Sequence, residues 1–327
     1  MQIFRETHID FLRWRWHALI LSWLLILGGV AALWVKGGLP LGIDFSGGTI
    51  VVMKFEQPVS EQQVRDALAS LPGEKVVQQY GQPGQNEILV RLPELIAEEG
   101  AALERGANAV LDTVRQANLG SFEIISTEIV GPVIGRDLQR KGIYATLASL
   151  LGILLYISFR FRFSFAVGAV VATFHDLAIT VTFLTFFGYE LSLNAVAALL
   201  AITGYSVNDT IVIFDRVREN LRSMRRDALE PVVNRSVNEM LGRTVITSGT
   251  TFIAVLSLFI FGGEVLHGFA FTMLVGIVTG TYSSVFIAAA IAIFMSERSG
   301  RARHRAISPV TANETKSRKA SRRARAS

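Results

Sequence analysis

Six long apolar stretches set the tightest limit on how this chain can fold. A helix needs about 20 apolar residues to cross the roughly 30 Å hydrocarbon core of a bilayer. Half of the 327 residues are hydrophobic, and the mean hydropathy is +0.41. We therefore predict a polytopic α-helical membrane protein whose six transmembrane helices span residues 18–36, 139–159, 163–187, 191–214, 244–261 and 269–295.

The first apolar stretch follows three arginines, Arg5, Arg13 and Arg15, as the core of a signal peptide would. It is longer than the apolar core of a typical signal peptide, and further spans come after it. We interpret it as an uncleaved first helix.

The composition excludes several kinds of chemistry. The chain has no cysteine, so disulfide and thiol chemistry are absent. Its 5 histidines are scattered without the spacing of metal ligands, and no glycine-rich loop of the ATP-binding type occurs. We expect no metal, no cofactor and no enzymatic activity.

The distribution of basic residues predicts the orientation in the membrane. Most of the 32 lysines and arginines fall on one side if the N-terminus (1–17), the loop at 215–243 and the tail at 296–327 are cytoplasmic. The positive-inside rule favours this orientation. Arg136, Arg140 and Lys141 run against it, because they would lie at the outer end of the second helix.

The tail at 296–327 is rich in arginine, serine and alanine and lacks an apolar period. Such a composition predicts disorder. Its basic residues would be attracted to anionic lipid by about 1 kcal/mol each near the surface. Binding to ribosomal RNA is the weaker alternative, and we expect no specific nucleic acid partner.

Residues 37–138 form a long polar segment in which acidic residues outnumber basic ones. Ser60 and Gln63 have the spacing of a capping box at the start of a helix. The predicted order is β-α-β-β-α-β, with strands at 48–56, 75–80, 87–92 and 121–130 and helices at 60–71 and 93–118. This order is the ferredoxin-like motif, which hosts many functions. No nucleophile or carboxylate pair stands out, so we interpret the segment as an extracytoplasmic binding or lever module.

The sequence LGIDFSGGT at 41–49 precedes the first strand and contains Asp44, Gly47 and Gly48. Glycines allow positive φ and close approach of backbones. Taken alone, the segment predicts a tight connection from the first transmembrane helix into the sheet.

Asp209 interrupts the fourth apolar stretch, where a carboxylate costs several kcal/mol. Tyr205 lies one turn earlier on the same face, and Gly204 and Asn208 belong to a neighbouring stripe of small and polar residues. We expect the carboxylate to face other helices or a hydrated cavity. It would be either a proton-binding site or a buried carboxylate satisfied by a neighbouring helix.

Arg243, at the start of the fifth stretch, is a candidate counter-ion for Asp209, and Thr247 lies one turn further along. The alternative for Arg243 is that it extends to the membrane surface.

Asp176 is the deeper carboxylate, near the middle of the third stretch. It is a second candidate for proton transfer, or a partner for Asn208 or a threonine. Its neighbour His175 is expected to point elsewhere.

The sixth stretch carries Gly276, Gly280 and Ser284 at intervals of four residues. Small residues on one helix face allow close helix packing in a membrane. We expect this face to pack within the chain or against a partner.

These motifs together resemble the SecF family of bacterial protein-export subunits. The resemblance extends over about residues 15–298 and rests on GIDFSGG, VGPVIG, HD, GYSVNDTIVIFDRVREN, RTVITSGTT and GTYSS. It implies a six-span half of a twelve-span unit of the resistance–nodulation–division type, completed by SecD. It also implies association with the SecYEG channel, with a YajC-like protein as a further candidate partner, and use of the proton-motive force to help export preproteins. The family's functional intramembrane aspartate and arginine fall on Asp209 and Arg243.

Two other functions remain open at this point. An exporter of small molecules or lipids would carry a second six-span half and a second outer domain in one chain. A structural scaffold for the translocation channel would tolerate neutral replacement of Asp209 and Arg243.

Overall fold

The computed structural model describes residues 7–71, 75–81, 84–92, 101–161, 163–224 and 227–298. The basic tail, from residue 299 on, and the first part of the helix predicted at 93–118 lie outside the described residues.

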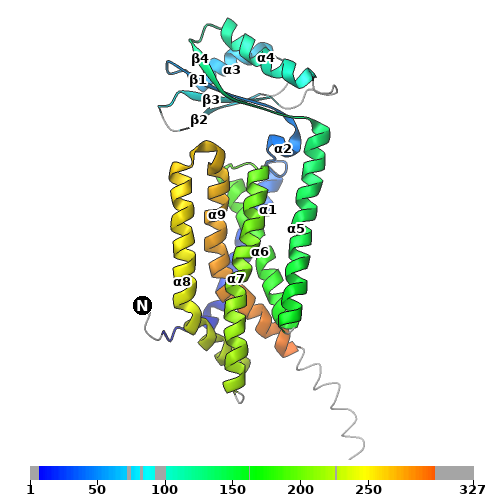
Figure 1. Cartoon of the computed structure of the whole chain (residues 1–327), viewed down its shortest axis with the longest axis vertical. Coiled ribbons are helices and arrows are strands. Elements are labelled where there is room, and N and C mark those ends of the chain that lie inside the picture. The colour runs from blue at the N-terminus through cyan, green and yellow to red at the C-terminus, as the bar shows by residue number, and fades with distance from the viewer. Residues whose placement is uncertain are drawn as a thin grey trace, which may run out of the picture.

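Six long helices form a bundle, with a small α+β domain at one end (Figure 1). They are α1 (Arg15–Val35), α5 (Pro132–Arg160), α6 (Phe163–Phe187), α7 (Leu193–Ser223), α8 (Leu229–Phe261) and α9 (Gly263–Ser283). The helix of α9 continues through a π-helical turn, Ser284–Ala288, and the whole span reaches Arg298. All six are long and apolar enough to cross a membrane, which confirms the predicted fold class.

The bundle has inner and outer helices. In their most apolar windows α6, α7 and α9 are 50% to 67% buried, whereas α1, α5 and α8 are 6% to 17% buried. The inner helices therefore carry most of the buried polar residues. The outer helices present apolar side chains to lipid or to another protein. On α1 the exposed Trp14 and Trp34 lie near its two ends, as tryptophans do at the two membrane surfaces.

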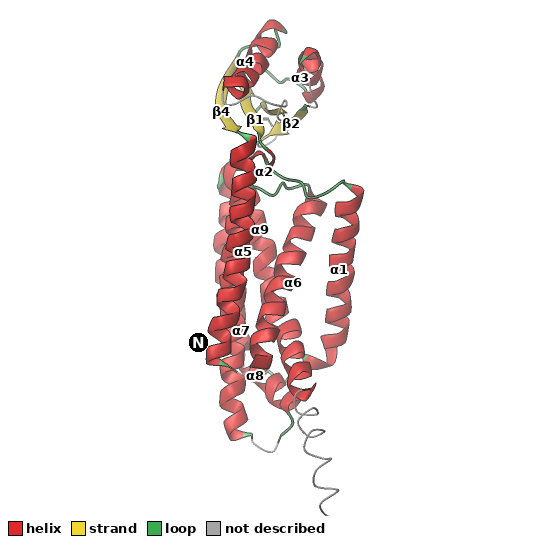
Figure 2. Ribbon diagram, turned by 90° about the vertical axis from the view of Figure 1, so that its right-hand side faces the viewer, coloured by secondary structure: helices red, strands yellow, loops and turns green. Residues whose placement is uncertain are grey.

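The small domain contains a four-stranded sheet in the order β2-β3-β1-β4, and every described neighbouring pair is antiparallel. The strands are β1 (Gly48–Phe55), β2 (Val76–Tyr80), β3 (Glu87–Leu92) and β4 (Phe122–Val130). Helices α3 (Glu61–Ala67) and α4 (Ala101–Gln116) cover the face that points away from the bundle (Figure 2). The order β1-α3-β2-β3-α4-β4 confirms the predicted ferredoxin-like motif.

Alternation along the strands places the domain's core between the sheet and the two helices. Val51, Met53 and Phe55 of β1 are at most 2% exposed there and pack with Val64 of α3 and Val110 of α4. The capping box at Ser60 and Gln63 is formed, so local sequence determines where α3 begins.

The domain joins the bundle through two short connections. Gly131 separates β4 from α5, which begins at Pro132. On the other side a short helix, α2 (Ile43–Ser46), lies between α1 and β1. The connection predicted for this segment therefore contains a full helical turn.

At the opposite end of the bundle, α7 and α8 continue beyond the apolar stretches into a polar hairpin. Arg216 forms ion pairs there with Glu219 and Glu239. Asn234 and Asn238 of α8 bind the backbone of Ile9 and so fix the segment before α1. Polar contacts thus hold the helix ends together where the apolar stretches stop.

Candidate functional site

Helix α7 presents two different faces around its polar residues. Asp209 is 4% exposed and lies inside the bundle. Asn208 and Gly204 are exposed, and a Cβ placed on Gly204 would meet nothing within 4 Å. Among the residues that the structure describes, this face of α7 is therefore open.

Asp209 lies where α7, α8 and α9 meet. Ser248 of α8 donates a hydrogen bond to Asp209 Oδ2 at 3.4 Å, a long distance for a hydroxyl donor. The Ser248 hydroxyl is also 2.7 Å from the hydroxyl of Thr281 on α9. The nearest hydroxyl to Asp209 therefore comes from Ser248 rather than from its neighbour Thr247, although both belong to the threonine- and serine-rich run that the sequence singled out.

Arg243 lies on α8 and is exposed. It forms no ion pair with Asp209 within 4.0 Å, both residues being in the described part of the chain. Opposite charges attract one another at such a separation too, although more weakly than in direct contact. The side chains of Arg243 and Asp209, predicted to pair, are thus not in direct contact in this conformation. Arg243 lies closer than Asp209 to the end of the bundle opposite the small domain.

Two buried hydroxyls flank this site without partners among the described residues: Tyr205 Oη and Thr244 Oγ1. Tyr205 lies one helical turn from Asp209 toward the sheet, and Thr244 lies one turn from Ser248 toward the far end. Buried polar atoms without a protein partner are commonly satisfied by water. Polar groups suited to water therefore lie on both sides of the carboxylate.

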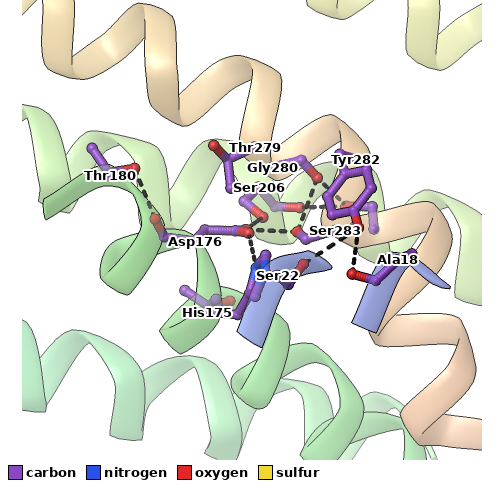
Figure 3. Close-up of polar contacts among 12 residues, drawn as sticks. Ala18, Ser22, His175, Asp176, Thr180, Ser206, Thr279, Gly280, Tyr282 and Ser283 are labelled. Atoms are coloured by element: carbon purple, nitrogen blue, oxygen red, sulfur yellow. Dashed lines mark hydrogen bonds and ion pairs between the residues drawn. The ribbon is translucent and has the colours of Figure 1, made fainter. Parts of the chain in front are cut away.

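Asp176 of α6 is 0% exposed and is contacted by hydroxyl donors from two other helices and by the ring of His175 (Figure 3). The hydroxyls of Ser206 on α7 and Ser283 on α9 both donate to Oδ2, the latter at 2.8 Å. The other oxygen, Oδ1, lies 3.0 Å from Nδ1 of His175. One carboxylate thus links α6, α7 and α9.

These contacts differ from the partners expected for Asp176. Thr180 donates to the backbone oxygen of Asp176 and Thr173 donates to Ala169, so neither reaches the carboxylate, and Asn208 faces outward. The expectation that His175 points elsewhere is wrong. The sequence placed Thr173 and Thr180 on the correct helix face but could not show which serines of α7 and α9 lie opposite.

A second set of contacts extends from this region toward α1. Tyr282 donates to the backbone oxygen of Ala18 at 2.8 Å and lies 3.3 Å from Ser22 Oγ. The rings of Tyr282 and His175 are 6.3 Å apart between centroids. Polar contacts thus join α1 to the inner helices at the depth of Asp176.

Two glycines of α9, Gly276 and Gly280, lie directly against α7. A Cβ on Gly276 would overlap the side chain of Ile202, and one on Gly280 would lie 3.0 Å from Ser206 Cβ. Ser284 lies 2.9 Å from the hydroxyl of Thr210. The absence of side chains at 276 and 280 therefore allows the close approach that brings Ser206 and Ser283 to Asp176.

The motif at the entry to the small domain lies away from both carboxylates. Asp44 accepts a hydrogen bond from the backbone of Leu193, the first residue of α7, at 2.8 Å. Gly47 and Gly48 have φ of 74° and 128°, which favours glycine. The motif residues are thus located where the small domain meets the bundle.

The fold and these sites define a class of protein: a polytopic membrane transport component with carboxylates buried among its helices and one domain outside the bilayer. The chain matches the family described as "Protein export membrane protein SecD/SecF, C-terminal" over residues 110–298 and the "SecD/SecF GG Motif" over residues 32–59. It belongs to the SecD/SecF family of protein-export membrane proteins.

Relatives in this family are SecF subunits. The protein translocase subunit SecF of Desulfurispirillum indicum is 40% identical over 298 residues, which cover 90% of this chain and 94% of the relative. The Escherichia coli O157:H7 subunit is 39% identical over 285 residues and 87% of each chain. This chain is accordingly a SecF-type membrane transport subunit, a class distinct from enzymes.

The structure is similar to that of SecDF from Thermus thermophilus, which is described as a translocon-associated membrane protein. The TM-score is 0.78 at 34% identity, over 89% of this chain. The chain spans 39% of the length of that SecDF protein. A second structure, SecDF in a super-membrane-facing form, gives a TM-score of 0.67 over 92% of this chain.

Proposed function

We propose that this SecF subunit works with SecD to couple the proton-motive force to preprotein export through the SecYEG channel. The supporting observation is Asp209, a buried carboxylate with one long hydrogen bond, a separated arginine and partnerless hydroxyls on both sides. A carboxylate held this weakly can gain and lose a proton without breaking a strong contact. The family assignment gives no support to the alternative of a small-molecule or lipid exporter.

The proposed cycle begins when Asp209 binds a proton and loses its attraction to Arg243. Helices α7 and α8 then change their relative position, because Ser248 is bonded to Asp209 and to Thr281 of α9. The small domain follows and acts on the emerging chain. Moving one charge through 100 mV supplies about 2.3 kcal/mol, which shifts a two-state equilibrium nearly fifty-fold.

The face of the bundle that carries Asn208 and Gly204 is the proposed contact with SecD. Ala197 and Ala201 continue this exposed stripe along α7, between the sparsely buried helices α5 and α8. Small residues allow a second helix to approach closely, and Asn208 can donate hydrogen bonds across the interface. A pseudo-symmetric partner helix would then lie directly beside the helix of Asp209. A YajC-like protein is a further proposed partner of the same complex.

The proposed orientation places the small domain outside the bacterial plasma membrane and both termini in the cytoplasm. The start of α1 and the end of the last membrane span lie at the same end of the bundle, opposite the sheet (Figure 1). The basic residues near that end agree with a cytoplasmic location. The tail is proposed to bind anionic lipid there.

The proposal is tested with the subunit, SecD and SecYEG reconstituted in vesicles with and without a proton gradient. Asp209→Asn should remove the export stimulation that depends on the gradient, while export in vesicles without a gradient stays unchanged. The matched control is Asp215→Asn on the same helix, because Asp215 is half exposed and pairs with Arg160 at the membrane boundary. Full stimulation by Asp209→Asn would instead favour a scaffold role.

A further inference from the structure

The side chain of Asp44 connects the entry motif to α7. It accepts the backbone N–H of Leu193 at 2.8 Å, and Ser192 accepts that of Ala195 at 3.2 Å. Free N–H groups in the first turn of a helix are stabilised by such oxygens. The cap supplied by Asp44 comes from a residue 149 positions earlier in the chain, so it is a tertiary contact rather than a local helix signal.

The backbones of the two segments also pair. Gly42 N donates to Leu191 O at 2.9 Å, and Leu191 N donates to Pro40 O at 2.7 Å. A Cβ on Gly42 would lie 3.3 Å from Leu191 O, so the residue must be small for the segments to meet. The segment 40–48, which we call the elbow, is thereby attached to the loop between α6 and α7.

Arg91 attaches the sheet to the same place. It extends from β3, forms an ion pair with Glu190 in the α6–α7 loop, and donates to Leu41 O at 3.0 Å and to Ser46 Oγ at 2.9 Å. The guanidinium group provides several donors in a fixed plane, so one side chain can hold the sheet, the elbow and the loop together.

The elbow also rests on α5. A Cβ on Gly47 would lie 3.3 Å from Pro132 Cα, and one on Gly135 would lie 3.0 Å from Phe45 O. The glycines of GIDFSGG and VGPVIG thus form the two halves of one close contact. The elbow consequently touches β3, the first turn of α5 and the first turn of α7.

On the side of α8 and α9 a gap separates the described part of the sheet from the bundle. A cavity of about 490 Å³ lies between them, lined by residues that include Glu87, Ile125, Phe259 and His267. Tight contact on one side and open space on the other allow the sheet to tilt about the elbow when α7 moves.

We propose that the elbow transmits displacement of α7 to the small domain, with Asp44 and Arg91 as the positioning residues. This inference rests on the proposed function. Asp209 lies 16 residues along α7 from Leu193, about 24 Å at 1.5 Å per residue. A helix transmits displacement over such a length because its backbone is hydrogen-bonded throughout. Asp44 is attached to the first turn of α7 by its hydrogen bond with the backbone N–H of Leu193.

The test uses the absence of cysteine from the chain, which permits spin labels at chosen pairs of positions. The outer pair is Gln116 of α4 with Val265 at the start of α9, and the inner pair is Trp14 with Ser223 at the far end of α7. All four are exposed. Distances are measured in the complex with SecD, its cysteines replaced, in lipid nanodiscs over a range of pH, and export stimulation is measured in parallel.

In the wild type both pairs should respond to pH. Asp44→Ala and Arg91→Ala should keep the response of the inner pair, abolish that of the outer pair, and reduce gradient-dependent export at least tenfold. Asp44→Asn keeps an oxygen that can accept from Leu193 and should restore both responses. Asp112→Ala, which removes an exposed carboxylate on α4 paired with Arg115, is the matched control and should change neither.

Unchanged response of the outer pair in Asp44→Ala and Arg91→Ala would overturn this inference and leave the proposed function standing. No pH response of either pair in the wild type would overturn the proposed function and the inference together. Thermal unfolding of each variant guards against general loss of structure. Arg91→Ala leaves the cap on α7 intact, so the two variants test the elbow from opposite sides.

Discussion

Asp176 and Asp209 lie on adjacent helices of one bundle, are almost equally buried, and are held very differently. Asp176 is 0% exposed, with hydroxyl donors from two other helices and the ring of His175. Asp209 is 4% exposed and has one donor at 3.4 Å. Burial alone therefore does not identify which carboxylate binds and releases a proton. The number of hydrogen-bond donors to each carboxylate is the distinguishing feature. Several donors indicate a carboxylate that connects helices, and one weak donor is compatible with a carboxylate that gains and loses a proton.

This contrast sharpens the roles proposed for the two residues. Protonation of Asp176 would weaken contacts to α7 and α9 at once, whereas protonation of Asp209 disturbs one weak bond. We therefore propose that Asp209 carries the coupled proton and that Asp176 holds the inner helices together.

The largest expected effect is on stability, from Asp176→Ala. The change removes the carboxylate that accepts from Ser206 and Ser283, although Ser283 can still donate to Gly280 O. It also opens a cavity, so it should cost about 3–5 kcal/mol. Thermal unfolding of the purified subunit in detergent measures it. Asp176→Asn keeps an acceptor and should cost less. Wild-type stability of Asp176→Ala would remove the distinction between the two carboxylates.

Asp209→Asn should give the opposite result: stability within about 1 kcal/mol of the wild type and loss of gradient-dependent export. The amide can still accept from Ser248, so only the ability to ionise is lost. Measuring unfolding and export on the same preparation separates the two effects. Unfolding comparable to that of Asp176→Ala would show that Asp209 is also a structural carboxylate.

Two glycines provide a second comparison, between a position packed inside the bundle (Gly276) and a position on the exposed face of α7 (Gly204). Gly276→Ala places a methyl group into Ile202 and should cost about 1–3 kcal/mol. Gly204→Ala meets nothing within this chain and should be neutral or slightly stabilising in the isolated subunit. Thermal unfolding of both variants, without SecD, measures the difference. Equal destabilisation would contradict the assignment of inner and open faces.

The smallest expected effect concerns Glu190, outside the membrane-spanning segments. Burial raises the pKa of this carboxyl above its ordinary value, and Arg91 only partly opposes the shift. The folded protein therefore binds this proton more tightly than the unfolded chain does, so the stability that Glu190 contributes falls as pH rises through the folded pKa. Glu190→Gln should flatten this dependence in weakly acidic solution, by less than about 1 kcal/mol. An unchanged pH profile of thermal unfolding would contradict it.

The sequence was sufficient for those parts of the fold that depend on local pattern. Apolar length gave the six membrane helices, alternation and turn residues gave the four strands, and Ser60 with Gln63 gave the start of α3. Each of these signals lies within one segment of about 4 to 25 residues.

The contacts between segments could not be predicted in the same way. Helical spacing showed that Asp176 faces inward, but the identity of its partners depends on how far α6, α7 and α9 are shifted along one another. Asp44 was visible as a motif residue, yet its partner Leu193 lies 149 positions away. Ser248 lay within a recognised run, and only the packing of α8 against α7 distinguishes it from Thr247.

The π-helical turn Ser284–Ala288 affects the direction in which side chains of the last membrane helix point. Successive residues of a helix point about 100° apart, and a π turn changes that angle locally. Ser283 and Ser284, although adjacent, reach Asp176 on α6 and Thr210 on α7 respectively. An ordinary α-helix already separates two consecutive serines by about 100°, so the wider turn acts on the residues that follow them. Because a π turn takes up one extra residue, deleting one residue here would restore an uninterrupted α-helix and leave the direction of the residues beyond it unchanged.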